Sequence, residues 1–424
     1  MNISELKQKL NDFNPATRID AVKTAAELIK SGEIKVEPAT DAHNLHCHTF
    51  YSFNGYGFSP SYIAYIAKTQ GWFAAGIVDF DVLDAVDEFL NACSIFEIRP
   101  LCGVETRAFI DKFSDKVINS PGEPGIAYHM GVGFTKTSPE NKDAFEFLKV
   151  MKERARKRTE ALVEKVNNYL APVELEFEKD AVPLTPAGNV TERHVCNAYE
   201  KKAEKLFKDK DKLAEFWSEK LEISKSEALN LLKESVALQG KIRAKTMKSG
   251  GPGYMHPTPE SFPPLKEFNK FIIQCGAIPT IAWLDGLSSG EQALDELLEL
   301  HIDAGAGVFN IIPDRNWNIA DAELKAKKVS ELEKVVEACE KRDLPIIVGT
   351  EMNAPGQKLV DSFDVPEMSK FTEIFKRGAA IVSAHTQLSL EGKGYLSEWA
   401  FSTFKTVADK NNYFADYGFN MLKK

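Results

Sequence analysis

The segment FAAGIVDF, residues 73–80, is a short apolar run with an aspartate near its end, and it reads as a buried β-strand. The segment IRPLCGVETRAFI, residues 98–110, has the same character, and helical patterns such as EQALDELLELHIDA at 291–304 separate the later runs. Those later strand-like runs are AYHMGVGF (127–134), GAIPTIAWL (276–284), GAGVFNII (305–312), LPIIVGTEM (344–352) and GAAIVSAH (378–385). Buried strands that alternate with helices predict an α/β fold with a parallel sheet covered by helices, either open or closed into a barrel.

Two regions depart from this alternation. Residues 1–40 predict a helical arm, in which Asn14 caps a helix and Pro15 occupies its first position. Residues 146–255 are almost entirely charged helical sequence, and they predict a helical domain inserted into the α/β body. The two parts of that body are 41–145 and 256–424.

The composition limits the function. The chain has 424 residues, of which 43% are hydrophobic and 27% are charged, as in ordinary globular proteins. A formal net charge of -9 argues against a general nucleic-acid binder, although it leaves room for a small basic pocket. Because the sequence shows no signal-peptide pattern and no apolar run long enough to span a membrane, we expect a cytoplasmic protein with no membrane partner. The 6 cysteines include no CxxC pair, which favours buried thiols in a reducing compartment.

Two histidines stand two positions apart in NLHCHTFYSF, residues 44–53. A strand projects such residues to the same side, so His46 and His48 are expected to point together while Cys47 points away. A metal ion would use both imidazoles, and an ordinary pair of strand histidines is the alternative.

Further histidines and carboxylates lie where an α/β fold keeps a metal site. The carboxyl ends of parallel strands share one rim of the sheet, and histidine together with carboxylate suits Zn, Fe or Mn. The candidates at or near strands are Asp79, Asp81, Glu105, His129 and Glu351, and His194 lies near the start of a helix. Taken singly, His129 is expected to be a buried core residue, and His194 is expected to make a polar contact at the start of its helix. His301 is expected to lie on the surface of a helix.

The order and spacing of three motifs resemble the PHP family, named for polymerase and histidinol phosphatase domains. That family has D-L-H-x-H-[ST]-x-x-S-D-G, then a strand that ends D-H-D, then G-x-E. The matching motifs are NLHCHTFYSFNG (44–55), GIVDFD (76–81) and GVE (103–105), with further similarity at TERHVCNAYEKKA (191–203) and IIVGTEMN (346–353). The resemblance covers about 41–145 and 185–355. It implies a distorted seven-stranded (β/α) barrel of PHP type, with a metal cluster at its C-terminal rim and an inserted helical domain.

The resemblance also implies two divalent transition-metal ions (Zn, Fe or Mn) in place of the three that the family can hold. The residues that match the first ion's ligands are His46, His48, Glu105 and Glu351, and those that match the second ion's are Glu105, His129 and His194. The positions of the third ion's ligands carry Asn54, Phe80 and Asn353. Because one complete ligand set is lost while the other two are retained or chemically similar, the pattern predicts a two-metal site. Trp283 stands where the family has a histidine, and with Phe80 it predicts an apolar wall of the cleft.

The function that the resemblance implies is hydrolysis of a small phosphorylated metabolite by a water molecule that two metals activate. Asp79 or Asp81 is expected to take a proton or to orient His46. Arg193 is expected to hold a phosphate oxygen, with a surface ion pair as its alternative. Two other functions stay open, namely a two-metal hydrolase of another bond such as an amide, and a catalytically inactive barrel that binds a ligand. The sequence does not indicate an oligomeric state.

Overall fold

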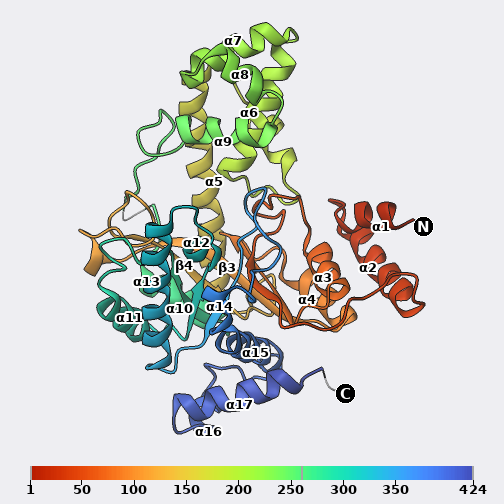
Figure 1. Cartoon of the computed structure of the whole chain (residues 1–424), viewed down its shortest axis with the longest axis vertical. Coiled ribbons are helices and arrows are strands. Elements are labelled where there is room, and N and C mark those ends of the chain that lie inside the picture. The colour runs from red at the N-terminus through yellow and green to blue at the C-terminus, as the bar shows by residue number, and fades with distance from the viewer. Residues whose placement is uncertain (1, 259–260, 423–424) are drawn as a thin grey trace. The chain divides into compact units, whose positions relative to one another are not determined.

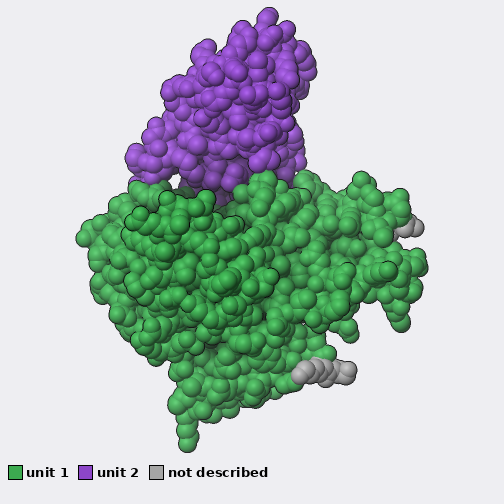
Figure 2. All heavy atoms as spheres, viewed as in Figure 1, with its two compact units in different colours: residues 1–50, 54–148, 259–424 green, residues 51–53, 149–258 purple. Residues whose placement is uncertain are grey.

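The computed structural model describes residues 2–258 and 261–422. The chain divides into two compact units, which Figure 2 shows in different colours. The first unit comprises Met1–Phe50, Asn54–Leu148 and Pro259–Lys424, and the second comprises Tyr51–Phe53 and Lys149–Thr258. Every strand named below belongs to the first unit.

A seven-stranded sheet forms the centre of the first unit, with its strands in chain order from β1 to β7. Figure 1 labels two of these strands, β3 and β4. Neighbouring strands are parallel except at β4, which runs antiparallel to both β3 and β5. The strands are β1 (His43–Cys47), β2 (Ala74–Phe80), β3 (Arg99–Phe109), β4 (Ile126–Val132), β5 (Ile278–Trp283), β6 (Val308–Ile311) and β7 (Ile346–Val348). The sequence predicts a strand at each of these places, but it does not show that β4 is reversed.

The sheet closes on itself where β1 meets the residues that follow β7. The Glu351 N–H donates to the carbonyl oxygen of His46, and the His48 N–H donates to that of Glu351, each at 2.7 Å. Asn44 supports the same seam, because its side chain donates to Thr350 Oγ1 at 2.7 Å. The fold is therefore a distorted seven-stranded (β/α) barrel, as the sequence predicts.

The seam depends on a glycine. β1 passes so close to Gly349 that a Cβ there would lie 2.4 Å from the backbone nitrogen of His46 and 2.7 Å from Oδ1 of Asn44. A side chain at this position would push the first strand, and His46 with it, away from the rest of the barrel.

The sequence predicts a strand at 378–385, and this prediction is wrong, because the segment lies within helix α15 (Thr372–Ser389). A short apolar run does not distinguish a buried strand from a buried helix. Buried side chains of α15 join a hydrophobic cluster that includes Leu45 of β1. A Cβ at Gly378 would lie 1.8 Å from the carbonyl oxygen of Ile346, the first residue of β7. α15 therefore covers the end of the barrel at which β7 and the strands parallel to it begin.

Other helices of the first unit follow the strands (Figure 1). They are α3 (Pro60–Thr69), α4 (Val86–Phe96), α10 (Leu265–Gln274), α11 (Leu294–Asp303), α12 (Asp314–Trp317), α13 (Ala322–Glu340), α14 (Pro366–Ser369), α16 (Glu398–Thr403) and α17 (Val407–Asn420). Within the described residues, no helix combines the length and the hydropathy that a membrane span needs.

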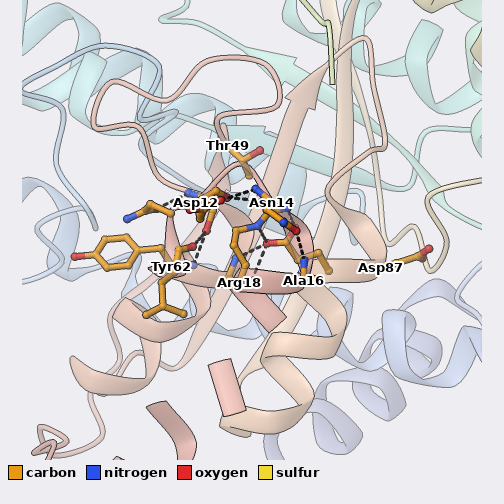
Figure 3. Close-up of polar contacts among 12 residues, drawn as sticks. Asp12, Asn14, Ala16, Arg18, Thr49, Tyr62 and Asp87 are labelled. Carbon is orange, nitrogen blue, oxygen red and sulfur yellow. Dashed lines mark hydrogen bonds and ion pairs between the residues drawn. The ribbon is translucent and has the colours of Figure 1, made fainter. Parts of the chain in front are cut away.

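An N-terminal arm of two helices, α1 (Ile3–Leu10) and α2 (Pro15–Lys30), packs on α3 and α4. Asn14 caps α2, as the sequence predicts, because its side chain accepts from the Ala16 N–H at 2.9 Å. Arg18 of α2 is fully buried, and Figure 3 shows it among the polar contacts of the arm. Its guanidinium donates through two nitrogens to the carboxylate of Glu88 in α4. The arm is thus held to the barrel by a buried ion pair.

The second unit is helical and has a hydrophobic core of its own. Its helices are most of α5 (Lys142–Leu170), with α6 (Glu192–Leu206), α7 (Lys210–Leu221), α8 (Lys225–Leu231) and α9 (Ser235–Thr246). Trp217 and Tyr199 are buried in that core, and the Tyr199 hydroxyl donates to Asn167 Oδ1 at 2.8 Å.

Candidate metal centre

Three buried side chains converge at the rim of the barrel. His46 ends β1 together with Cys47, His48 follows directly, and Glu105 belongs to β3. One ligand atom from each of the three lies within 4.8 Å of the others. Glu105 Oε2 is 3.4 Å from His48 Nε2 and 3.6 Å from His46 Nε2. The structure therefore places the two histidines side by side and next to Glu105, while their role as metal ligands stays a prediction.

The charges within this group stabilise one another. Burial disfavours the charged form of His46, but the negative charges of Glu105 and Glu351 outweigh burial and raise the pKa of His46. Burial on its own would raise the pKa of Glu105, yet the neighbouring His46 and His48 lower the pKa of Glu105 to about 2. Glu105 is therefore an anion at every physiological pH, and its negative charge attracts positive charge.

These residues fit a divalent transition-metal ion. Neither ring nitrogen of His46 has a hydrogen-bond partner among the described residues, although the side chain is buried. An unpartnered buried nitrogen is costly, whereas a metal ion would use its lone pair. Imidazole nitrogen and carboxylate oxygen are ligands of Zn and of the neighbouring metals, and three protein ligands leave a position for water or substrate.

The residues around the histidines hold them in place. The ring of Phe80 stacks on that of His48, with centroids 4.2 Å apart and planes 22° apart. Asp79 is buried and accepts from both the N–H and the Oγ1 of Thr49, at 2.8 and 2.7 Å. Since Thr49 follows His48 directly, Asp79 fixes the chain at this candidate ligand and not at the ring of His46.

Asp81 has a different local role. Its Oδ1 accepts from Thr106 Oγ1 at 2.6 Å, and its backbone adopts a left-handed φ of 61°. The Asp81 N–H donates to the carbonyl oxygen of Glu105 at 2.9 Å. These contacts tie the end of β2 to the strand that carries Glu105.

Glu351, the fourth predicted ligand of the first ion, lies beside the group but is engaged elsewhere. Its Oε2 accepts from Arg315 Nη2 at 2.6 Å and from Asn353 Nδ2 at 3.2 Å. Glu351 and Met352 both have left-handed φ values, 62° and 52°, which residues other than glycine rarely adopt. Backbone strain of this kind clusters at functional sites, and here it lies at the seam of the barrel.

His129, a predicted ligand of the second ion, does not join the group. It pairs in register with Thr106 of β3, whereas Glu105 pairs with Met130, so the two side chains lie on opposite faces of the sheet. Its Nε2 donates to Asn269 Oδ1 of α10 at 2.7 Å, and burial lowers the pKa of His129 to about 4. The neutral imidazole is part of the packing between the sheet and its helices.

Two other sequence interpretations fail because of which face of an element the side chain occupies. His301 of α11 is not on a helix surface: it is buried, and its ring stacks on that of His129 with centroids 5.0 Å apart. Trp283 does not line a cleft with Phe80. Instead it packs with Leu298 of α11 and Leu332 of α13 in a cluster outside the sheet.

The remaining two candidates lie in the second unit. His194 takes part in a capping box at the start of α6, where its Nδ1 accepts from the Thr191 N–H at 3.1 Å. Burial lowers the pKa of His194 to about 3, so its imidazole is neutral. Arg193, its neighbour, is partly buried, and burial lowers its pKa. The local contact of His194 is the helix-start contact that the sequence offers as an alternative.

Asn54, Phe80 and Asn353 occupy the positions that the sequence comparison matched to ligands of a third ion, and two of the three have structural roles. Asn54 donates to the carbonyl oxygen of His48 at 2.8 Å and accepts from the Tyr56 N–H at 2.8 Å. Asn353 donates to Glu351, as described above. Phe80 is the third, and its ring occupies space beside His48.

Three residues near the rim have no motif in the sequence that would identify them. Tyr128 alternates with His129 and therefore faces the side of Glu105, 6.3 Å between centroids from the ring of Phe80. Asn310 of β6 pairs with Ala282 and is buried, and its Oδ1 has no hydrogen-bond partner in the described part of the chain. Arg315 follows β6 in α12. Only strand register and the seam with Glu351 bring these side chains to the site.

Comparison with known proteins supports the fold. No protein-family model matches the chain, and no curated protein matches it. One similar structure is an amidohydrolase from Chromobacterium violaceum with bound sulfate and no metal, at 15% identity and a TM-score of 0.50. Another is provisionally named a metal-dependent phosphoesterase, from Bifidobacterium adolescentis, at 17% identity and a TM-score of 0.50. Each alignment covers 78% of this chain and 96% of the other chain. At these identities the likeness concerns the fold alone.

Proposed function

We propose that the protein is a metal-dependent hydrolase of the PHP type that cleaves a small phosphorylated metabolite. The observation that carries this proposal is the buried group of His46, His48 and Glu105, whose ligand atoms lie within 4.8 Å of one another. A divalent transition metal, when bound there, would activate water and polarise an oxygen of the substrate. Both structures reported above are named as hydrolases, which supports this choice.

The proposal differs in metal number from what the sequence implies. Because His129 faces away from Glu105, the second predicted ion lacks one of its three ligands. We therefore assign one ion to the His46, His48 and Glu105 group and do not assign a second. The chain's own contribution is to hold two imidazoles and an ionised carboxylate in place, through the stacked Phe80, the Asp79–Thr49 contacts and the backbone hydrogen bonds of Glu351.

The experiment combines elemental analysis with an activity screen of the full chain. We expect about one Zn, Mn or Fe ion per chain and hydrolysis of a phosphomonoester that stops after chelation and returns with metal. Amide substrates form a second arm of the same screen. If the protein hydrolyses amides but not phosphate esters, its substrates are amides and the proposed phosphoesterase activity is wrong. If the metal-loaded protein hydrolyses neither, the result supports a catalytically inactive barrel that binds a ligand.

A further inference from the structure

The guanidinium of Arg315 lies next to the metal group. It follows β6, and its Nη2 donates to Glu351 Oε2 at 2.6 Å. Glu351 in turn bonds through its backbone to both His46 and His48. Arg315 is therefore a fixed cation at the rim that carries the candidate metal ligands.

Most hydrogen-bond donors of Arg315 are unused. A guanidinium has five N–H groups. Among the described residues, that of Arg315 makes one hydrogen bond, to Glu351, and 39% of its side chain is exposed. Arg99, by contrast, donates through all three of its nitrogens to backbone carbonyls. Arg342 likewise uses three nitrogens, to Glu299, Asp295 and the carbonyl of Ala338.

The contact with Glu351 orients the free donors. The Glu351 side chain is 10% exposed and is itself held by Asn353, so it fixes one end of the guanidinium of the partly exposed Arg315 side chain. A planar fork held in this way is suited to two oxygens of a phosphoryl group, and less ordering is needed when it binds. A lysine would satisfy Glu351 equally well but would not present such a fork.

We propose that Arg315 is the residue that recognises the phosphoryl group, by donating to its non-bridging oxygens while the phosphoryl group lies at the metal. This assignment rests on the proposed function, because it places the substrate's phosphoryl group beside His46, His48 and Glu105. It gives Glu351 a positioning role, since Glu351 orients the arginine.

Binding of inorganic phosphate tests the proposal without requiring turnover. The metal-loaded parent, Arg315→Gln and Arg315→Lys are titrated with phosphate by calorimetry, and the metal content of each is measured. Arg342→Gln is the matched control, because Arg342 lies just before β7 starts, at the opposite end of that strand from Glu351. We expect Arg315→Gln to keep its metal and to bind phosphate about 10- to 100-fold more weakly, as for loss of a charged hydrogen bond. Arg315→Lys should recover part of this loss, and Arg342→Gln should bind like the parent.

The other outcomes are distinct. If metal-loaded Arg315→Gln binds phosphate as the parent does, or if the parent does not bind phosphate, the assignment is overturned. If Arg315→Gln loses its metal and phosphate binding per metal is unchanged, Arg315 only supports Glu351, and the assignment is overturned as well. If the parent binds phosphate through Arg315 but hydrolyses no phosphate ester, the recognition stands and the proposed hydrolysis fails.

Discussion

Oε2 of Glu105 lies 3.4 Å from Nε2 of His48, although Glu105 belongs to β3, His48 directly follows β1, and β2 lies between these two strands. Both side chains are buried, so the charge of Glu105 acts on the imidazole with little screening by solvent. We therefore expect Glu105 to be the residue on which metal binding at the candidate site most depends.

Glu105→Gln keeps the size of the side chain and removes its charge. We expect the affinity for Zn to fall at least about 100-fold, more than is usual for a residue that only orients a ligand. Isothermal titration of the metal-free protein measures this change. Glu123→Gln is a suitable control, since Glu123 is a buried carboxylate paired with Arg107 and is not part of the metal group. Equal affinities in Glu105→Gln and the parent would exclude Glu105 as a ligand.

Metal binding should weaken on acidification from an unusually high pH. A proton and a metal ion compete for the imidazole of His46, and the pKa of His46 is raised above its ordinary value of 6.5. The decline should therefore begin above pH 6.5. Glu351→Gln removes one of the charges that raise this pKa, so its decline should begin at a lower pH. Metal titrations between about pH 5 and pH 9 compare the parent with Glu351→Gln. If metal affinity depends on pH in the same way in both proteins, Glu351 does not raise the pKa of His46.

The metal-free protein should show two pH windows of stability. The raised pKa of His46 gives a contribution that is complete below pH 6.5 and is lost as the pH rises through the raised value. The pKa of Glu105, lowered to about 2, gives a contribution that is present above its ordinary value of 4.5 and is lost as the pH falls toward 2. Denaturant unfolding measured across this pH range should show that the free energy of unfolding of the parent falls at acidic pH. The fall should be smaller in Glu105→Gln.

His129→Gln should leave metal content unchanged. The residue packs outside the sheet against Asn269 and His301, so its loss should lower the free energy of unfolding by about 1–3 kcal/mol. His46→Gln, in contrast, should lose metal. Elemental analysis of the two folded variants measures their metal content. Loss of metal from His129→Gln would restore the prediction that His129 is a ligand.

Gly378→Ala tests the covering of the barrel end by α15. The new methyl group would lie 1.8 Å from the carbonyl oxygen of Ile346, so α15 has to move, and we expect a loss of about 3 kcal/mol or more. Gly240→Ala, within α9, is the matched control, because a Cβ there meets nothing within 4 Å. That change should stabilise its helix by up to about 1 kcal/mol. Thermal unfolding of both variants measures the difference.

Arg18→Met tests the attachment of the N-terminal arm. It leaves the mostly buried Glu88 without its cation, and the expected loss is about 3 kcal/mol. Lys9→Ala is the control, since the ion pair of Lys9 with Glu5 is half-exposed and contributes less than about 1 kcal/mol. Limited proteolysis should cut the arm faster in Arg18→Met than in the parent or in Lys9→Ala. Equal rates and equal stability would mean that other contacts hold the arm.

The sequence by itself determined the positions of the strands and the members of one candidate metal-binding group. Apolar runs of strand length mark β2, β3 and β5, because buried strands need continuous apolar side chains. The two-residue spacing places His46 and His48 on one side for the same local reason. Local pattern also located the cap of α2 at Asn14, which requires no knowledge of the rest of the chain.

Only the tertiary structure decided which face each remaining candidate occupies. β4 runs antiparallel, and its register with β3 turns His129 away from Glu105, while Tyr128 takes the side facing it. A shift of one residue exchanges the two faces of a strand, so a motif that locates a strand does not fix its side chains. The run 378–385 lies within a helix, and its burial on all sides removes the periodicity that would have separated helix from strand in the sequence. Arg315 reaches the site only through Glu351, across a seam that forms when the barrel closes.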